Sequence, residues 1–152
     1  MSGWTNKGKW EALALFCRNV TRATNYYVIL FTDASAPGAD TNTESDLTEI
    51  ADGSGYTTGG YQLTPGDTDF DVLTEDDTND RGLVQIKDVV WTASGGTIPD
   101  SGDGARYAML TDDNATIANR EAYQYWDLVS ARSVSDGQAL TLQNLEIRIN
   151  ES

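Results

Sequence analysis

The chain has 152 residues, of which 39% are hydrophobic, and it carries a formal net charge of −14 with one cysteine and no histidine. This length and composition fit a single globular domain with one packed core and argue against a disordered chain. Without histidine the chain contains no Ser-His-Asp or Cys-His relay and no His-containing zinc site, and its single cysteine excludes an internal disulfide.

The charge is unevenly distributed along the chain. Residues 1–32 carry four Lys or Arg and one acid, whereas residues 33–80 carry thirteen acids and no Lys or Arg. A field of this sign repels nucleic acid and anionic membranes, so direct contact with either is not expected. Three interpretations remain open: plain solvation, docking of the basic N-terminal segment on an acidic neighbouring subunit, or Ca²⁺ binding by acidic loops. No export signal is recognised, so we expect the protein to stay in a cytoplasm or to assemble there.

The first predicted element is a short amphipathic helix over Lys9–Arg18, within an N-terminal arm of residues 1–24. Apolar residues recur there at helical spacing on one face, namely Trp10, Leu13, Ala14, Cys17 and Val20. A face of this kind normally packs against the core. We therefore expect it to be buried, with Cys17 as a small core residue.

The next segments predict short strands separated by loops. Tyr26–Thr32 is β-branched and aromatic throughout, which indicates a strand buried on both sides or at an interface. Thr43–Ile50 is expected to form a single helical turn capped by Ser45. A strand is predicted over Tyr61–Thr64, and Asp67–Asp80 has room for one short strand before an exposed acidic loop.

The second half has the strongest strand pattern. Leu83–Ala93 is rich in Val and Ile and contains Trp91, and Lys87-Asp88 in its middle suggests a second bulge or an edge position. Ala105–Thr111 and Ala122–Leu128 are expected to be strands whose side chains alternate between two faces. Frequent turn signals separate these segments. The pattern predicts an all-β fold, an antiparallel β-sandwich (jelly-roll or Ig-like) of seven to eight short strands with a short N-terminal helix, in a single domain of residues 1–152.

The end of the chain shows a change of parity. Leu140 and Leu142 occupy even positions, whereas Leu145, Ile147 and Ile149 occupy odd ones. Because strand side chains alternate between faces, an unbroken strand would bury one set and expose the other. The sequence therefore predicts a bulge or turn at Gln143-Asn144 that returns both sets to one core, after a turn at Ser135-Asp136-Gly137.

The motifs of common enzyme classes are absent from the sequence. It has no phosphate-binding Gly-x-x-x-x-Gly-Lys loop and no Gly-x-Gly-x-x-Gly fingerprint. A pair of carboxylates could hydrolyse a glycoside, but with twenty-four acids such a pair has no specificity. We predict that the protein is not an enzyme.

Two binding sites are weighed against simpler interpretations. The oxygen-rich run with Glu75, Asp76, Asp77 and Asp80 is a candidate Ca²⁺ site, although Lys87 stands where an EF-hand counted from Asp76 needs Glu. The alternative is a solvated loop, and no other cofactor is expected. A second candidate is a glycan-stacking platform, against which core packing is the commoner role; its residues would be Tyr123, Tyr125 and Trp126.

The order of features resembles a group of small tailed-bacteriophage virion proteins, found as capsid decoration or cement proteins and as tail or fibre components. After the N-terminal helix, the segments that carry this resemblance are Asn25–Asp33, Ala36-Pro37, Gly59–Tyr61, Asp88–Ala93, Ala105–Asp113, Val134–Leu142 and Leu145–Ile147. The resemblance covers nearly the whole chain. It implies a β-sandwich, a homo-oligomer and a virion location after assembly in the bacterial host. The acidic stretch Asp67–Asp80 departs from the group's pattern.

The expectation is therefore a capsid decoration protein that binds copies of itself and the major capsid protein or other virion subunits. Its partner-binding residues would lie in the basic arm and the strand that follows, namely Lys7, Lys9, Trp10, Arg18, Arg22, Tyr26 and Tyr27. Burial of aromatic and aliphatic surface would hold the contact, and charge would orient it. The alternative is a tail-tip or fibre module that binds a host surface glycan.

Overall fold

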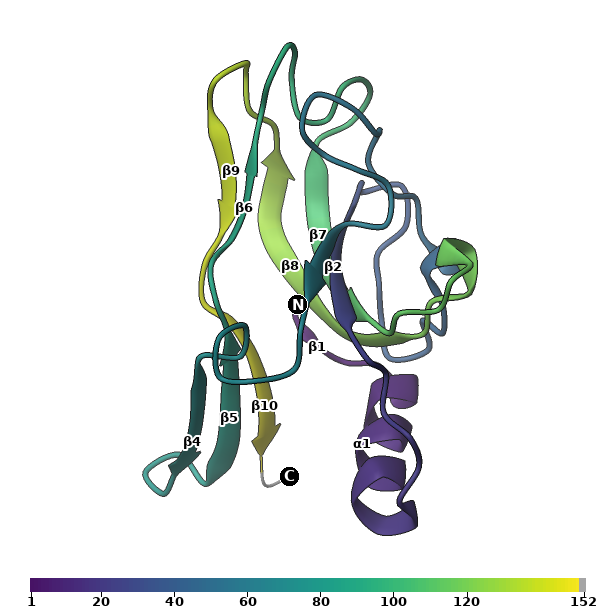
Figure 1. The fold of residues 1–152 in the computed structure, drawn as a ribbon, viewed down its shortest axis with the longest axis vertical. Coiled ribbons are helices and arrows are strands. Elements are labelled where there is room, and N and C mark those ends of the chain that lie inside the picture. The colour runs from purple at the N-terminus through teal and green to yellow at the C-terminus, as the bar shows by residue number, and fades with distance from the viewer. Residues whose placement is uncertain (151–152) are drawn as a thin grey trace.

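The computed structural model describes residues 1–150 as two layers of antiparallel strands with one helix at the N-terminal end (Figure 1). The first layer is a five-stranded sheet in the order β1-β8-β7-β2-β3. Its strands are β1 (Gly3–Trp4), β2 (Tyr26–Phe31), β3 (Tyr61–Leu63), β7 (Ala105–Thr111) and β8 (Ala122–Arg132). The helix α1 (Asn6–Arg18) packs against β8.

The second layer consists of two short sheets that run into one another. One has the order β10-β5-β4 and the other pairs β6 with β9. The strands are β4 (Val72–Asp76), β5 (Arg81–Ile86), β6 (Val89–Thr92), β9 (Ala139–Leu142) and β10 (Leu145–Asn150). Two single 3₁₀ turns, η1 (Glu44–Asp46) and η2 (Ile117–Asn119), lie in the connections.

The all-β sandwich with a short N-terminal helix is confirmed. The structure has ten strands in residues 1–150 rather than seven or eight. Two of the additional strands arise because the Leu83–Ala93 and Gln138–Ile149 segments are each divided by a break. Another, β1, is only two residues long and has no alternation that a sequence pattern could reveal.

The predicted break is confirmed and has a counterpart on the partner strand, but the predicted burial of Ile149 is wrong, because that residue lies at the exposed end of β10. Leu142 and Leu145 are both buried, and Asn144 between them has a left-handed φ of 56°. Opposite them, Val89 pairs with Leu142 and Ile86 with Leu145, and both partners are buried. The same number of residues lies between the paired positions on each strand. In both strands the set of core-facing residues therefore shifts between even and odd positions at the same place. The register is kept without a one-residue bulge.

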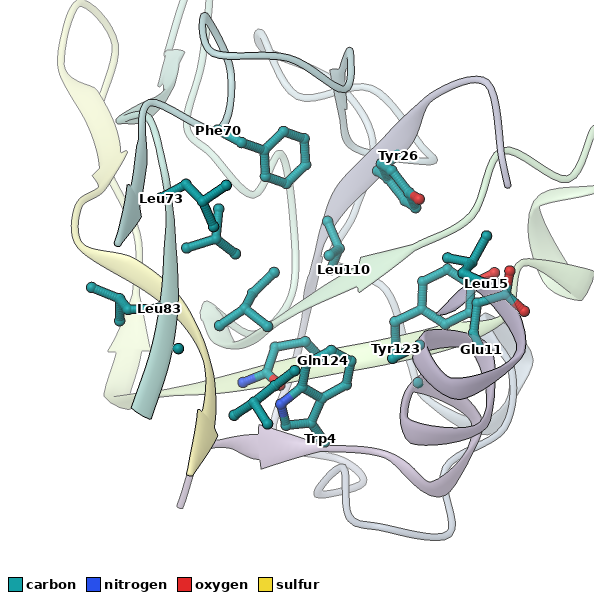
Figure 2. Close-up of a pocket in the computed structure, with 16 residues that line it drawn as sticks. Trp4, Glu11, Leu15, Tyr26, Phe70, Leu73, Leu83, Leu110, Tyr123 and Gln124 are labelled. Atoms are coloured by element: carbon teal, nitrogen blue, oxygen red, sulfur yellow. The ribbon is translucent and has the colours of Figure 1, made fainter. Parts of the chain in front are cut away.

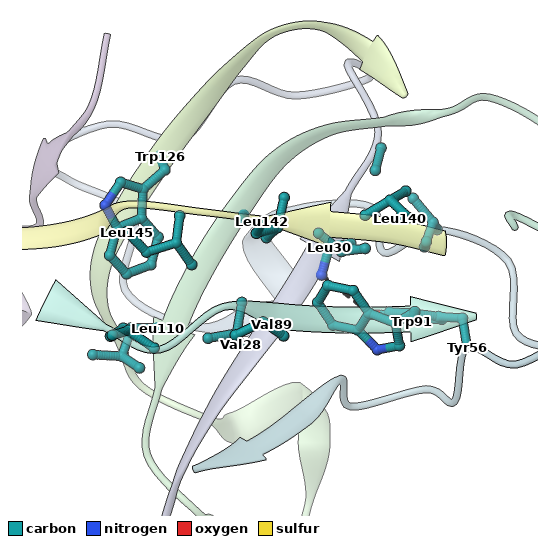
Figure 3. Packing of buried hydrophobic residues seen from close by; sticks show 14 of the residues in the cluster. Val28, Leu30, Tyr56, Val89, Trp91, Leu110, Trp126, Leu140, Leu142 and Leu145 are labelled. Carbon is teal, nitrogen blue, oxygen red and sulfur yellow. Dashed lines mark hydrogen bonds between the residues drawn. The ribbon is translucent and has the colours of Figure 1, made fainter. Parts of the chain in front are cut away.

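The main core lies between the two layers (Figure 3). Val28 and Leu30 on β2 point into it, while Ile29 and Phe31 point to a second cluster on the other face of the same sheet. The four side chains have no exposed surface, which confirms that this strand is buried on both sides. The second cluster includes Leu47 from the long connection between β2 and β3, so that connection covers the sheet's outer face.

Two tryptophans join the layers at the free edge of β10. The Trp126 indole N–H donates to the Glu146 carbonyl at 3.0 Å, and the Trp4 indole N–H donates to the Arg148 carbonyl at 2.7 Å. Strand carbonyls at a sheet edge lack a ladder partner, and side-chain donors can satisfy them. These two bonds attach β10 to β8 and β1.

The helix begins three residues before its predicted start. Thr5 caps it, because its side chain accepts a hydrogen bond from the Gly8 amide at 2.9 Å, and it ends at Arg18 before a left-handed Asn19. Gly8 is required for close packing, since a Cβ there would collide with the Tyr123 carbonyl. In η1 the predicted cap Ser45 is wrong: Thr43 is the cap residue, and Ser45 lies inside the turn.

The predicted burial of the apolar helix face is also wrong. Of that face only Ala14 is buried, whereas Trp10, Leu13 and Val20 are exposed. Cys17 is exposed as well and is not a core residue. The helix packs through its first turn, where glycine allows contact with β8, and therefore a different side of the helix faces the sandwich.

Candidate functional site

One end of the sandwich is open. There α1 and the β4–β5–β10 sheet extend beyond the body of the molecule and face each other across a gap (Figure 1). The gap contains an apolar cleft of about 330 Å³. Its lining includes Leu15 from α1, Tyr26 from β2, Phe70 before β4 and Ile147 from β10 (Figure 2). We call this region the cleft.

On the sheet side of the cleft, the side chains change from apolar to acidic toward the tip of the β4–β5 hairpin. Cross-strand pairing places Leu73, Val84 and Ile147 in one row, and the next row toward the tip contains Glu75, Gly82 and Ile149. Leu73 is 83% exposed and Ile149 is 65% exposed. The turn that follows β4 adds carboxylates at the tip, at Asp77 and Asp80.

A few polar groups are set into the apolar lining. Gln124, only 4% exposed, has a side-chain oxygen with no hydrogen-bond partner in the described residues. Burial raises the pKa of Glu11, and the neighbouring Glu121 carboxylate raises it further. Burial also raises the pKa of Tyr123, whose ring stands edge-on to Tyr26 at 6.2 Å between centroids. These groups make a sparse polar lining in a surface that otherwise suits apolar contact.

The other side of α1 carries a second apolar surface. Glu11, Ala12 and Leu15 face the cleft, but the helix presents a different set of side chains to solvent. We call this set the outer stripe; it consists of Trp10 (55% exposed), Leu13 (64%), Phe16 (90%), Cys17 and Val20. A shallow groove of about 350 Å³ lies along it, and Arg18 contributes to its wall.

The charged groups at the open end divide into paired and unpaired sets. Lys7 pairs with Glu121 at 2.8 Å, and Arg81 pairs with Asp76 at 2.7 Å. Within residues 1–150 the other charges form no ion pair: they are Lys9, Glu11, Arg18 and Arg22 on the helix side and Glu75, Asp77 and Asp80 on the hairpin side. The open end therefore has a basic side, formed by α1 and the residues that follow it, and an acidic side, formed by the β4–β5 hairpin. We call them the basic prong and the acidic prong.

The structure separates the residues predicted to bind partners. Lys9, Trp10, Arg18 and Arg22 are exposed, and the first three border the grooves of α1. Lys7 is held by its ion pair.

The two tyrosines of that set lie elsewhere. Tyr26 lines the cleft, whereas Tyr27 lies on the opposite face of β2. There the Arg120 guanidinium stacks 3.7 Å from the centre of the Tyr27 ring. Adjacent strand residues point to opposite faces, so Tyr26 and Tyr27 cannot belong to one surface with the helix.

The candidate calcium residues Glu75, Asp76, Asp77 and Asp80 line one shallow depression of the hairpin. Asp76 accepts hydrogen bonds from Asn79 and Arg81, which lower its pKa. Within residues 1–150, no group of three or more acidic, Cys or His side chains is placed to hold a metal ion. The run forms a β-turn with its own hydrogen bonds.

The candidate glycan platform is wrong. Tyr123, Tyr125 and Trp126 are each more than nine-tenths buried and lie in different environments. Tyr125 belongs to the outer cluster, Trp126 to the main core, and Tyr123 to the cleft wall. A stacking surface needs exposed coplanar rings, and these side chains instead support the sandwich.

Several residues of the open end were missed by sequence reasoning. Leu73 fits strand alternation, but its strand extends past the body, and so the residue is exposed. Ile149 was predicted to be in the core and is exposed for the same reason. Phe16 lies outside the predicted apolar face, and its neighbours in sequence gave no reason to single it out. In the sequence, Gln124 is one polar residue within an alternating strand and was not singled out for that reason. Its burial depends on β1 and the cleft, which are tertiary features.

Neither the length nor the apolarity of any helix in the part described is sufficient to span a bilayer. In comparisons with known proteins, no protein-family model, curated protein or solved structure matches the chain. The fold and the open end therefore define a class only at the level of architecture: an antiparallel β-sandwich with two apolar surfaces exposed at one end.

Proposed function

We propose that this protein is a structural subunit of a bacteriophage virion, most specifically a capsid decoration or cement protein that binds neighbouring shell subunits and copies of itself, without an enzymatic role. The observation that carries the proposal is the open end, where the outer stripe of α1 and the cleft both present apolar surface to solvent. Contiguous exposed apolar patches mark interaction surfaces, and the pattern of the sequence resembles virion proteins.

The energetics favour assembly through this end. Burying one large apolar side chain contributes roughly 1.5–3 kcal/mol. Phe16 and Leu73 retain most of their surface exposed, so a partner that covers them gains nearly the whole of that amount for each. The acidic β4–β5 hairpin would direct its side of the open end toward a basic neighbour, and the net charge of −14 would keep the protein away from the packaged nucleic acid.

The proposal is tested on particles from cells that carry the gene. We expect the protein to co-purify with gradient-purified virions assembled in the host cytoplasm, and a stained gel to give hundreds of copies per particle. A handful of copies would favour a tail or fibre position over decoration. Absence from purified virions would overturn the proposal.

A further inference from the structure

We infer that the outer stripe of α1 in one copy docks at the mouth of the cleft in the next copy, so that the subunits associate head to tail. The occupant of the cleft is a second copy of this chain. This inference rests on the proposed structural role and specifies its contact: the basic, apolar helix of one subunit meets the apolar, acidic β4–β5 hairpin of its neighbour.

The apolar parts of the two surfaces correspond. The outer stripe offers Trp10, Leu13 and Phe16, while the mouth of the cleft offers Leu73 and Ile149. A cleft of about 330 Å³ has room for one or two large side chains but not for a whole helix. We therefore place the helix across the mouth, with its aromatic side chains directed inward.

Charge complementarity identifies the occupant. Lys9 borders a groove between α1 and β10 that Leu13 and Ile149 of the same subunit also line. Arg18 lines the groove of the outer stripe. On the other prong, Glu75 and Asp77 surround Leu73 and Ile149 in a shallow depression of the hairpin. None of these four residues has an ion-pair partner within residues 1–150. Unpaired charges of opposite sign beside two exposed apolar surfaces give complementary edges.

The same charges argue against symmetric contacts. Contact between two hairpin tips would place Glu75 and Asp77 of one copy beside those of the other, and like charges close together repel each other. Contact between two outer stripes would oppose Lys9 and Arg18 in the same manner. A contact between different surfaces avoids both, and such contacts form rings or open chains according to the rotation between subunits.

Geometry within one subunit agrees with this arrangement. The cleft-facing residues Glu11, Ala12 and Leu15 and the solvent-facing Trp10 and Cys17 lie on different sides of α1. With 3.6 residues per turn, these two sets lie roughly on opposite sides of the helix. The helix can thus complete its own cleft while presenting the outer stripe to a neighbour.

A charge-reversal design tests the contact in solution. One variant carries Lys9→Glu and Arg18→Glu on the helix, and the other carries Glu75→Lys and Asp77→Lys on the hairpin. Sedimentation velocity of the native chain is expected to show concentration-dependent association. Each variant alone should weaken it by about tenfold or more, because each opposes like charges. Equimolar mixing of the two variants, or all four substitutions in one chain, should restore association.

Two further variants keep the test specific. Asp33→Lys with Asp103→Lys changes net charge by the same amount as the hairpin variant, at exposed acids outside the open end, and should associate as the native chain does. Gly82→Trp places a large side chain on the cleft side of β5, where a Cβ meets no atom within 4 Å. It should block association while leaving the thermal unfolding midpoint nearly unchanged.

The outcomes separate this inference from the proposed function. A native chain that remains monomeric, or association that survives both reversals, overturns the head-to-tail contact. Loss in each variant without restoration by mixing or combination also overturns it, because both surfaces would then contribute to self-association without contacting each other. None of these results changes whether the protein is found in virions, because that measurement is made on particles.

Discussion

Large apolar side chains are buried in the closed body of this molecule but exposed at its open end. In the body, Val28, Leu30 and Trp91 lie in a core covered from two sides, and even the buried Tyr56 hydroxyl donates to Glu49 at 2.6 Å. At the open end, Phe16 and Leu73 are more than four-fifths exposed. The difference indicates that the body provides most of the stability of the fold, and it is consistent with the proposed use of the open end for contact.

The largest expected effect is in the body. Trp91 is 5% exposed, and its ring lies 5.8 Å from that of Tyr56 and 6.0 Å from that of Tyr61. Trp91→Ala should lower the free energy of unfolding by about 3–5 kcal/mol, because it removes a large buried side chain and leaves a cavity. Urea denaturation measures this loss of free energy. Trp91→Phe should lose less, because the phenyl ring fills part of the space of the indole. A loss below about 1 kcal/mol would show that the core is not packed as described.

The joint between body and open end gives the next effect. Gln143 and Asp88 face each other across the break, where the Gln143 amide donates to the Asp88 carboxylate at 3.0 Å. Deleting Gln143 alone leaves one unmatched residue on the partner strand and should cost about 2–3 kcal/mol.

The paired deletion is the matched control for this joint. Deleting Gln143 and Asp88 together restores a continuous register in which Leu142 and Leu145 are two positions apart, on one face by ordinary alternation. Thermal denaturation should therefore find the double deletion more stable than the single one. If the Gln143 deletion is more stable than the double deletion, the core-facing residues of the two strands do not shift at the same place.

This joint also shows how far sequence reasoning reached. The parity of Leu140, Leu142, Leu145 and Ile147 predicted a break in the chain, and the break is confirmed because strand alternation is a local property. At the matching break, Lys87-Asp88, the sequence predicted a second bulge or an edge position. Which strand this break faces depends on pairing between residues far apart in the chain.

The helix shows the limit of periodicity as a guide to burial. Its apolar spacing identified a helix, but not the side that would face the sheet. That side is decided by Gly8, which permits close contact with β8, and by the distance that β4, β5 and β10 extend from the body. The exposed outer stripe was read as core for this reason. An apolar helix face has the same pattern whether it packs within its own chain or against a neighbour.

A pH-dependent effect is expected where β3 leads into the open end. The Asp69 carboxylate accepts from Lys87 and from the Thr64 amide, and these hydrogen bonds lower its pKa. A lowered folded-state pKa contributes stability above the unfolded value near 4, and that stability is lost as pH falls through the folded value. Asp69→Asn should cost about 1–2 kcal/mol at pH 7, and the difference from the native chain should shrink below about pH 4.

The matched control is Asp71→Asn, an exposed acid two residues away without a hydrogen-bond partner in residues 1–150. Its unfolding free energy should match that of the native chain across the same pH range. If Asp69→Asn keeps a constant difference down to pH 2, the pairing with Lys87 does not contribute through charge.

The smallest expected effect on folding is at the open end itself. Phe16→Ser and Leu73→Ser replace side chains that water already surrounds, so each should change the free energy of unfolding by less than about 0.5 kcal/mol at low protein concentration. Leu63→Ser is the comparison, because Leu63 is fully buried and the same chemical change there leaves a hydroxyl in the core. The two exposed substitutions should still weaken association, since they remove the apolar area that a partner would cover. Stability lost in proportion to size at all three positions would mean that the open end is part of the folding core, and the contrast between the two regions would not hold.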